Sequence, residues 1–158
     1  MSSTKVAIMM GSKNDKSTME EAEKVFDEFG VAYETKVLSA HRTPKETAAY
    51  AEGLKERGFQ VVICGAGMSA ALSGTVAAHT ILPVIGVPLN ASDLSGMDAL
   101  LSTVQMPPGV PVGCMALGKA GAKNAAFFAL RILGTNDPSL TKKLVSYGEE
   151  QRKKILEG

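Results

Sequence analysis

The sequence predicts an α/β domain in which helices cover both faces of a parallel sheet. Short apolar segments alternate along the chain with longer segments of helical periodicity. Repeated strand–helix–strand units form right-handed crossovers, which make the strands parallel and place helices on both faces. The 158 residues suffice for one domain with its own core, and no repeat, linker or low-complexity segment divides them. We therefore expect a single domain over residues 1–158.

Five apolar segments are the predicted strands. The first, residues 5–10, reads KVAIMM and stops at Gly11, which is typical of a strand buried on both faces of a sheet. The next four are residues 32–38, 60–64, 83–88 and 112–116. Prolines stand at the two ends of the fourth segment, so we expect them to bracket this strand without interrupting it.

The first helix is expected to begin near Ser17. Glu20 stands three residues later, which is the spacing of a capping box. Apolar side chains then recur at helical spacing up to Phe29, and Gly30 suits the left-handed residue that follows a helix. The segment therefore predicts an amphipathic helix that ends at Gly30.

The second helix has clear start signals. Thr43 is a suitable N-cap, Pro44 fits the first turn, and the helix is expected to reach about Arg57 before Gly58. Four further helices are predicted: an Ala-rich one that ends near residue 80, and residues 96–104, 119–133 and 137–158. The last of these is a C-terminal helical extension beyond the final strand.

The composition disfavours several classes of function. The chain has 17 basic and 16 acidic residues, few aromatic residues and no tryptophan, which argues against binding nucleic acid through phosphates or stacked bases. Cys64 and Cys114 fall in predicted strands as small apolar residues, and the two histidines do not stand at zinc-ligand spacing. The sequence shows no signal-peptide pattern and no apolar run of membrane length. We expect a cytoplasmic protein without metal or cofactor, and without a nucleic-acid or membrane partner.

Chemistry-bearing side chains gather in three segments that follow strands, residues 11–18, 39–44 and 65–74. Parallel strands bring their carboxyl ends to one edge of the sheet, so these segments should face a common crevice. Arg42 and serine hydroxyls suit a phosphate, Asp15 suits ribose hydroxyls, and His41 is left for proton transfer. This combination predicts a site for a small phosphorylated metabolite.

Each of these features also has a simpler structural explanation. The pair His41 and Arg42 could be part of a solvated surface loop, Asp15 could be a capping carboxylate, and the glycines of residues 65–67 could mark only a tight turn. Those glycines do not complete the pattern of a dinucleotide site. His79 is expected to be structural, and a flavin is disfavoured because the loops lack aromatic side chains to stack on it.

Five segments resemble one known family along nearly the whole chain. They read GSKND at 11–15, SAHRTP at 39–44, LPVIGVP at 82–88, QMP at 105–107 and GKAGAKNA at 118–125. They are similar to the class I 5-(carboxyamino)imidazole ribonucleotide mutases of bacterial purine biosynthesis. The resemblance implies a flavodoxin-like, three-layer α/β/α fold, a phosphorylated ribonucleotide as substrate, no metal or cofactor, and assembly as a homo-octamer.

The resemblance also implies roles for single residues. It makes His41 the general acid and base that moves a carboxylate from the exocyclic nitrogen of an imidazole to a ring carbon. Together with the loops, it gives the candidate site: His41 as catalytic residue, and Ser12, Asp15, Ser39, Arg42, Gly67, Ser69, Ala70 and Leu72 as substrate-binding residues. Apolar side chains within residues 68–72 are expected to confine the carbon dioxide released during the transfer.

One segment departs from the family pattern. Many class I members read GGAAHLPG where this chain reads GMSAALSG at 67–74, so Ala71 stands at the place of a second family histidine. The ending ALSG is closer to class II enzymes, which carboxylate aminoimidazole ribonucleotide directly with carbon dioxide, although those enzymes read His-Lys-Thr where this chain has HRT at 41–43. Direct carboxylation is therefore the alternative reaction. A non-catalytic protein that binds a phosphorylated ligand is the alternative function.

Two helices indicate an oligomer. Residues 119–133 are rich in Ala and Gly, which permits another helix to approach closely. The C-terminal helix offers an apolar strip formed by Leu140, Leu144, Ile155 and Leu156. Together, the two helices offer more apolar surface than is needed to cover one sheet of this size, which suits a homo-oligomer. We expect the helix 137–158 to pack at the oligomer interface.

Overall fold

The structure is a computed structural model that describes residues 5–158, so the expectations for residues 1–4 lie outside it. Within this range, strands and helices alternate as the sequence predicts. The strands are β1 (Val6–Met10), β2 (Tyr33–Val37), β3 (Val61–Gly67), β4 (Val84–Leu89) and β5 (Gly113–Cys114). The helices are the 3-10 turn η1 (Lys13–Asp15), α1 (Lys16–Phe29), α2 (Pro44–Gly53), α3 (Leu72–His79), α4 (Met97–Val104), α5 (Gly118–Gly134) and α6 (Pro138–Glu157).

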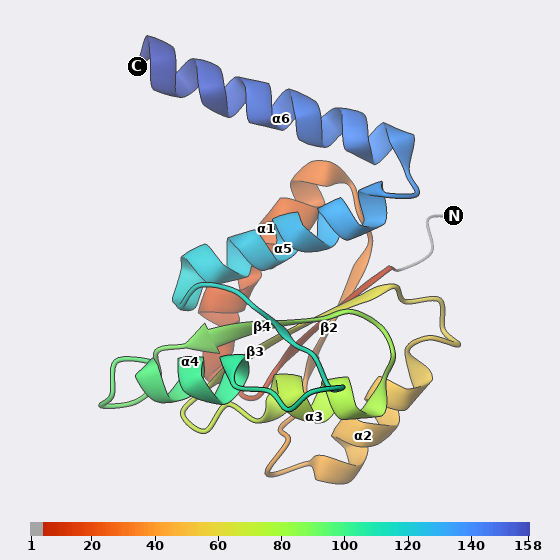
Figure 1. The fold of residues 1–158 in the computed structure, drawn as a ribbon, viewed down its shortest axis with the longest axis vertical. Helices are drawn as coiled ribbons and strands as arrows, with labels where there is room; N and C mark the ends of the chain where they lie inside the picture. Colours follow the sequence, from red (N-terminus) through yellow and green to blue (C-terminus); the bar gives the residue numbers. More distant parts are fainter. Residues whose placement is uncertain (1–4) are drawn as a thin grey trace.

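The sheet has the strand order β2-β1-β3-β4-β5, and all neighbouring strands are parallel. This is the flavodoxin-like order, which confirms the expected three-layer fold. In Figure 1, α1 and α5 lie on one side of the sheet, α2 and α3 lie on the other, and α6 lies outside α5. The chain passes from β1 to β2 on one side of it and then crosses to β3 on the other side, so a crevice opens beyond the carboxyl ends of β1 and β3.

Alternate side chains of β1 belong to two separate cores. Val6, Ile8 and Met10 lie in the apolar cluster with α1 and α5, whereas Ala7 and Met9 lie in the cluster with α2 and α3. All five are fully buried, because a strand points successive side chains to opposite faces of its sheet. Burial on both faces explains the unbroken apolar run that predicts this strand.

The start of α1 differs from the prediction. Ser12 is the N-cap of η1: its Oγ accepts a hydrogen bond from the Asn14 N–H at 3.2 Å. Asp15 Oδ2 in turn accepts one from the Ser12 N–H at 2.9 Å. The capping box therefore joins Ser12 and Asp15, and the one expected at Ser17 is wrong. The other end is as predicted, because Gly30 has left-handed backbone with φ 69°.

β3 is longer than predicted. Gly65, Ala66 and Gly67 continue the strand and pair in register with β4, so their expected place in a loop is wrong. A side chain on Gly65 would collide with Met19 of α1. This glycine is therefore required for close approach of a helix to the sheet, not for a turn. The longer strand carries Gly67 to the rim of the crevice.

The last two strands also differ from the prediction at their ends. β4 continues through Pro88 to Leu89, so this proline lies inside the strand. β5 is reduced to Gly113 and Cys114 and pairs only near the start of β4. The end of β4 therefore has a ladder on its β3 side alone, which makes a proline tolerable there.

α2 ends at Gly53, before the predicted end near Arg57. The Arg57 guanidinium instead donates two hydrogen bonds to Glu34 of β2, at 2.8 and 3.0 Å, and the Tyr50 hydroxyl donates a third at 2.8 Å. Partial burial raises the pKa of Glu34, but these hydrogen bonds outweigh it and hold the pKa below its ordinary value. The cluster fixes α2 against the edge strand, and α2 directly follows the loop that contains His41.

The small residues of α5 pack inside the chain. Gly121, Ala122, Ala125, Ala126 and Ala129 are buried in the core that α5 shares with α1. A side chain on Gly121 would collide with the Ala116 carbonyl. These five small residues are therefore used within the chain, and assembly with other copies through α5 stays a prediction.

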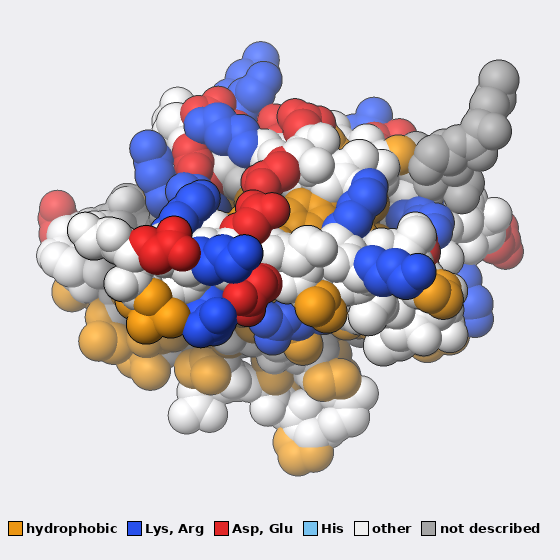
Figure 2. Space-filling model, turned by 90° about the horizontal axis from the view of Figure 1, so that it is seen from above, with side chains coloured by type: hydrophobic (Ala, Val, Ile, Leu, Met, Phe, Trp, Pro, Cys, Tyr) orange, Lys and Arg blue, Asp and Glu red, His pale blue; other side chains and the backbone are white. Residues whose placement is uncertain are grey.

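α6 extends beyond the body of the fold (Figure 1). Its first half packs onto the chain, since Leu140 is buried and Tyr147 contacts the ring of Phe29. Near its end, Ile155 and Leu156 are 84% and 69% exposed. Figure 2 shows acidic and basic side chains interspersed over this side of the molecule. None of the helices within residues 5–158 is long and apolar enough to cross a membrane.

Candidate active site

A cavity of about 410 Å³ opens at the carboxyl edge of the sheet, beyond β1, β2 and β3. Ligands bind at this place in open parallel sheets, beside the point where the strand order reverses. The structure brings all predicted site residues together in its lining: Ser12, Asp15, Ser39, His41, Arg42, Gly67, Ser69, Ala70 and Leu72. The three segments that the sequence singles out therefore do face one crevice.

The segment after β1 supplies a carboxylate. Asp15 is half-buried, and its Oδ2 already accepts the Ser12 N–H. Burial raises the pKa of the Asp15 carboxyl above its ordinary value, and the Ser12 hydrogen bond and the positive charge of Arg42 offset this only in part. A carboxylate accepts several hydrogen bonds, so the capping role and a ligand-binding role are compatible.

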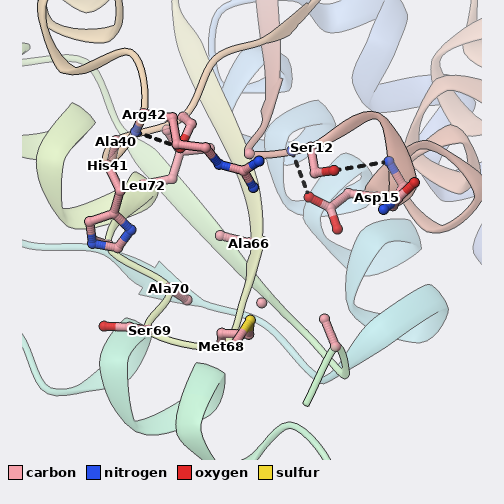
Figure 3. Close-up of a pocket in the computed structure, with 16 residues that line it drawn as sticks. Ser12, Asp15, Ala40, His41, Arg42, Ala66, Met68, Ser69, Ala70 and Leu72 are labelled. Carbon is pink, nitrogen blue, oxygen red and sulfur yellow. Dashed lines mark hydrogen bonds between the residues drawn. The ribbon is translucent and has the colours of Figure 1, made fainter.

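The segment after β2 presents two adjacent side chains to different parts of the cavity. His41 and Arg42 are both exposed. In Figure 3, the Arg42 side chain reaches across the cavity toward Ser12 and Asp15, while the His41 ring points toward Ser69. A ligand that spans the cavity can therefore meet a cation and a carboxylate at one part and an imidazole at another.

The end of β3 and the turn before α3 form an apolar side. Ala70 and Leu72 are buried, whereas Met68 is 60% exposed and has left-handed backbone with φ 54°. Such backbone is unfavourable for a residue with a Cβ atom and is held here by its surroundings. Two tight backbone hydrogen bonds shape the turn, from Ala70 N–H to Met68 O at 2.9 Å and from Ala71 N–H to Ser69 O at 2.7 Å.

The cavity also contains residues that the sequence did not identify as binding residues: Gly11, Asn14, Ala40, Ala66 and Ala91. Ala91 comes after β4 and lies beside Gly67, where a side chain on the glycine would collide with it. The signal that could have found Ala91 is its place just past a strand that neighbours β3 in the sheet. Met68 and Ala71, expected only as walls around carbon dioxide, line the cavity as well.

Other polar residues lie outside this cavity. The expected structural role of His79 is supported by its Nδ1, which is 2.9 Å from the Glu52 carboxylate. Cys64 is buried, and burial raises the pKa of its thiol, which disfavours a reactive thiolate. Ser73 is buried in α3 and does not line the cavity. Over residues 5–158, no group of three His, Cys, Asp or Glu side chains could hold a metal ion.

Comparison with known proteins gives this cavity a context. A family model described as AIR carboxylase matches residues 5–154. The curated N5-carboxyaminoimidazole ribonucleotide mutase of Vibrio parahaemolyticus is 54% identical over 96% of this chain and 94% of its own length. The Escherichia coli K12 protein of the same name is 48% identical over 97% of this chain and 90% of its own. The solved structure of Treponema denticola PurE has a TM-score of 0.85 and 31% identity, and covers 96% of this chain and 94% of that one. The chain therefore belongs to the AIR carboxylase family.

Proposed function

We propose that this protein is an N5-carboxyaminoimidazole ribonucleotide mutase of purine biosynthesis. It converts 5-carboxyamino-1-(5-phosphoribosyl)imidazole to 5-amino-1-(5-phosphoribosyl)imidazole-4-carboxylate by migration of the carboxylate. The observation that carries the proposal is the cavity, in which a histidine, an arginine and a carboxylate share one space with an apolar side. Relatives that are 54% and 48% identical over almost their whole length carry the name of this reaction.

The polar residues suit the ribose phosphate half of the substrate. The Arg42 guanidinium can donate two parallel hydrogen bonds to phosphate oxygens, and the Ser12 and Ser39 hydroxyls can donate further ones. Asp15 can accept hydrogen bonds from the two ribose hydroxyls. Because Arg42 reaches toward Ser12 and Asp15 (Figure 3), these groups bind neighbouring parts of one ligand.

His41 suits the reacting half of the substrate, because one imidazole can give up and take back a proton in turn. In the first step, protonated His41 donates its proton to the exocyclic nitrogen, and the bond from nitrogen to the carboxylate carbon breaks to release carbon dioxide. In the second step, the electron-rich ring carbon attacks carbon dioxide. Neutral His41 then removes the proton from that ring carbon, which restores the aromatic ring and the protonated imidazole.

The apolar side suits the short life of free carbon dioxide between these steps. A carbon dioxide molecule that leaves before the second step uncouples the reaction. The buried Ala70 and Leu72, together with the exposed Met68, offer an apolar surface on the side of the cavity where the His41 ring lies (Figure 3). Held in contact, the gas is already positioned for attack, which avoids the entropic cost of capture from dilute solution.

Turnover of two substrates tests the proposal. The purified protein should convert the carboxyamino ribonucleotide at ordinary bicarbonate, and aminoimidazole ribonucleotide only when bicarbonate is raised far above that. Ala71 should not abolish the reaction, because His41 alone can perform both proton transfers. Rapid turnover of aminoimidazole ribonucleotide at low bicarbonate, with the carboxyamino compound inert, would establish direct carboxylation. Tight binding of both ribonucleotides without turnover would establish a binding protein.

We also propose that the protein works in the cytoplasm as a homo-octamer, the state that the class I resemblance implies. Met97, Leu101 and Val104 recur at helical spacing on α4 and are each about half exposed. Together with the exposed apolar end of α6, this surface supports contacts between copies. Leu101→Lys should shift the sedimenting mass to smaller species, whereas a wild-type protein that sediments as an active monomer would refute the assembly.

A further inference from the structure

His41 and Arg42 depend on the backbone of their loop for position. Both side chains are exposed, and within residues 5–158 neither one forms a hydrogen bond to another side chain: the bond from Arg42 to Ser39 Oγ comes from the Arg42 backbone N–H. The loop lies between β2 and α2, outside the ladder of the sheet. The groups that hold this backbone therefore decide where the imidazole and the guanidinium point.

Ser39, near the start of the loop, is the centre of a dense hydrogen-bond network. Its N–H donates to Thr43 Oγ1 at 2.8 Å, and its Oγ accepts the Arg42 N–H at 3.1 Å. Its carbonyl lies near three donors: the Thr43 N–H at 2.9 Å, Thr43 Oγ1 at 3.0 Å and Thr47 Oγ1 at 3.2 Å. The turn that carries His41 is thus closed across its base by side chains as well as by backbone.

Thr47 differs from the other members of this network. It belongs to α2, lines no part of the cavity, and has no exposed surface. Its hydroxyl lies 2.8 Å from the Thr43 carbonyl, the usual partner of a helical threonine, and 3.2 Å from the Ser39 carbonyl. A hydroxyl has one proton to donate, so the two carbonyls share it. Formation of α2 explains the first contact but not the second, which reaches eight residues back into the loop.

We propose that Thr47 is a positioning residue for His41 and Arg42, and that its buried hydroxyl links the start of their loop to α2. Without this hydroxyl, the Ser39 carbonyl keeps only its contacts with Thr43, the residue just before α2, and the turn can shift relative to the cavity. Displacements below 1 Å matter for proton transfer and for phosphate binding alike. The kinetic part of this inference rests on the proposed mutase function, whereas the link itself does not.

The chain offers a matched control for Thr47. Thr103 of α4 is also a buried helical threonine, and its Oγ1 donates to the Ala99 carbonyl four residues back at 2.7 Å. It has no second acceptor in the His41 loop. Thr47→Val and Thr103→Val therefore remove the same group from similar surroundings, and only the first removes the link to the loop.

Kinetics give the first readout. Thr47→Val should lower kcat/KM for the carboxyamino ribonucleotide about tenfold, through a lower kcat and a higher KM, because His41 and Arg42 share the loop. Thr47→Ser keeps the hydroxyl and should retain nearly wild-type values, and Thr47→Cys, with a weaker donor, should lie between. Thr103→Val should keep kcat/KM. If Thr47→Val does not fold, the order of the Ser and Cys variants decides: equal losses in these two would overturn the proposal.

Imidazole signals in an NMR spectrum of the ligand-free protein give a second readout that needs no activity. The chain has two histidines, so His79→Asn assigns both signals. Thr47→Val should shift or broaden the His41 signal and leave the His79 signal unchanged, and Thr103→Val should leave both unchanged. An unaltered His41 signal in Thr47→Val would overturn the proposal. A wild-type protein without mutase activity would refute the proposed function. The NMR comparison would still test whether Thr47 positions the His41 loop, because it needs no activity.

Discussion

The two sides of the cavity are constructed in opposite ways. The polar side, residues 11–15 and 39–43, is held by hydrogen bonds between side chains and backbone, as at Ser12, Asp15 and Ser39. The apolar side, residues 66–72, contains the left-handed Met68 and buried apolar side chains, and is shaped by its own backbone. Directional bonds fix groups that must meet charge and protons, whereas confinement of an apolar gas needs only shape. Changes on the polar side should therefore alter kcat and the affinity for the ribonucleotide. Changes on the apolar side should alter how much carbon dioxide escapes before it is attached to the ring carbon.

The largest effect is expected at His41. His41→Asn removes the group that exchanges protons, so kcat should fall by about 10² to 10⁴. Affinity for the product, measured by calorimetry, should change little because the phosphate and ribose contacts remain. His79→Asn is the matched control on the other histidine and should keep full activity. A His41→Asn enzyme with wild-type kcat would show that His41 does not perform the proton transfers.

The next effect concerns phosphate binding by Arg42. Lysine is a point charge that cannot reproduce two parallel hydrogen bonds, so Arg42→Lys should raise KM about tenfold and change kcat less. Steady-state kinetics with the phosphorylated substrate measure both. An unchanged KM would place the phosphate elsewhere in the cavity.

A smaller effect of unusual sign is expected at Asp15. The pKa of the Asp15 carboxyl is raised in the folded protein, so its negative charge lowers the free energy of unfolding at any pH above that pKa. This loss of stability disappears below the pKa that the carboxyl has in the unfolded chain, because the group is then protonated in both states. Asp15→Asn should therefore raise the melting temperature at neutral pH while it raises KM for the ribonucleotide. Asp137 is the opposite case: backbone and serine hydrogen bonds lower its pKa, so its charge favours folding above the unfolded pKa and this is lost as pH falls through the folded pKa. Asp137→Asn should lower the melting temperature, and equal signs for the two variants would contradict the account.

The smallest effect on stability is expected on the apolar side. Met68→Gly relieves the left-handed backbone but gives the unfolded chain more freedom, so the free energy of unfolding should rise by only about 0.5 kcal/mol. Ser95→Gly is a matched control, because Ser95 has the same φ of 54° and lies outside the cavity. Both variants should gain similar stability in chemical denaturation. Only Met68→Gly should release more aminoimidazole ribonucleotide per turnover, because carbon dioxide then escapes before the second step. Equal release from the two variants would show that Met68 does not help to confine carbon dioxide.

The fold and most of the site could be predicted because local signals and strand order agree. The apolar run of β1 and the left-handed Gly30 required no knowledge of the tertiary structure. The differences arise where distant contacts decide. Gly65 resembles a turn residue, but it pairs with Val87 of β4, and the approach of Met19 explains why a glycine stands there. Arg57 resembles the end of a helix, but it lies in turns beyond α2, where its guanidinium donates to Glu34 of the distant strand β2.

The placement of the candidate site residues in one cavity agrees with the prediction better than the bounds of the strands do, because parallel strands bring their ends to one edge whatever their exact lengths. Ala91 was missed because it carries no chemical group and becomes part of the cavity only through the neighbouring position of β4 and β3. Thr47 was missed for a different reason. A threonine inside a helix has no signal of its own, and its second acceptor becomes visible only when the loop is folded.

The most direct test of the account follows the carboxylate carbon itself. The protein would be given substrate with ¹³C in the carboxyamino group, in unlabelled bicarbonate, with carbonic anhydrase present to mix any escaped carbon dioxide with the solution. Mass spectrometry of the carboxylated product then reports where its carbon came from. Transfer inside the cavity predicts that the product keeps the ¹³C. A product with the isotope composition of the surrounding bicarbonate would show that the carbon dioxide comes from solution, and would contradict the account.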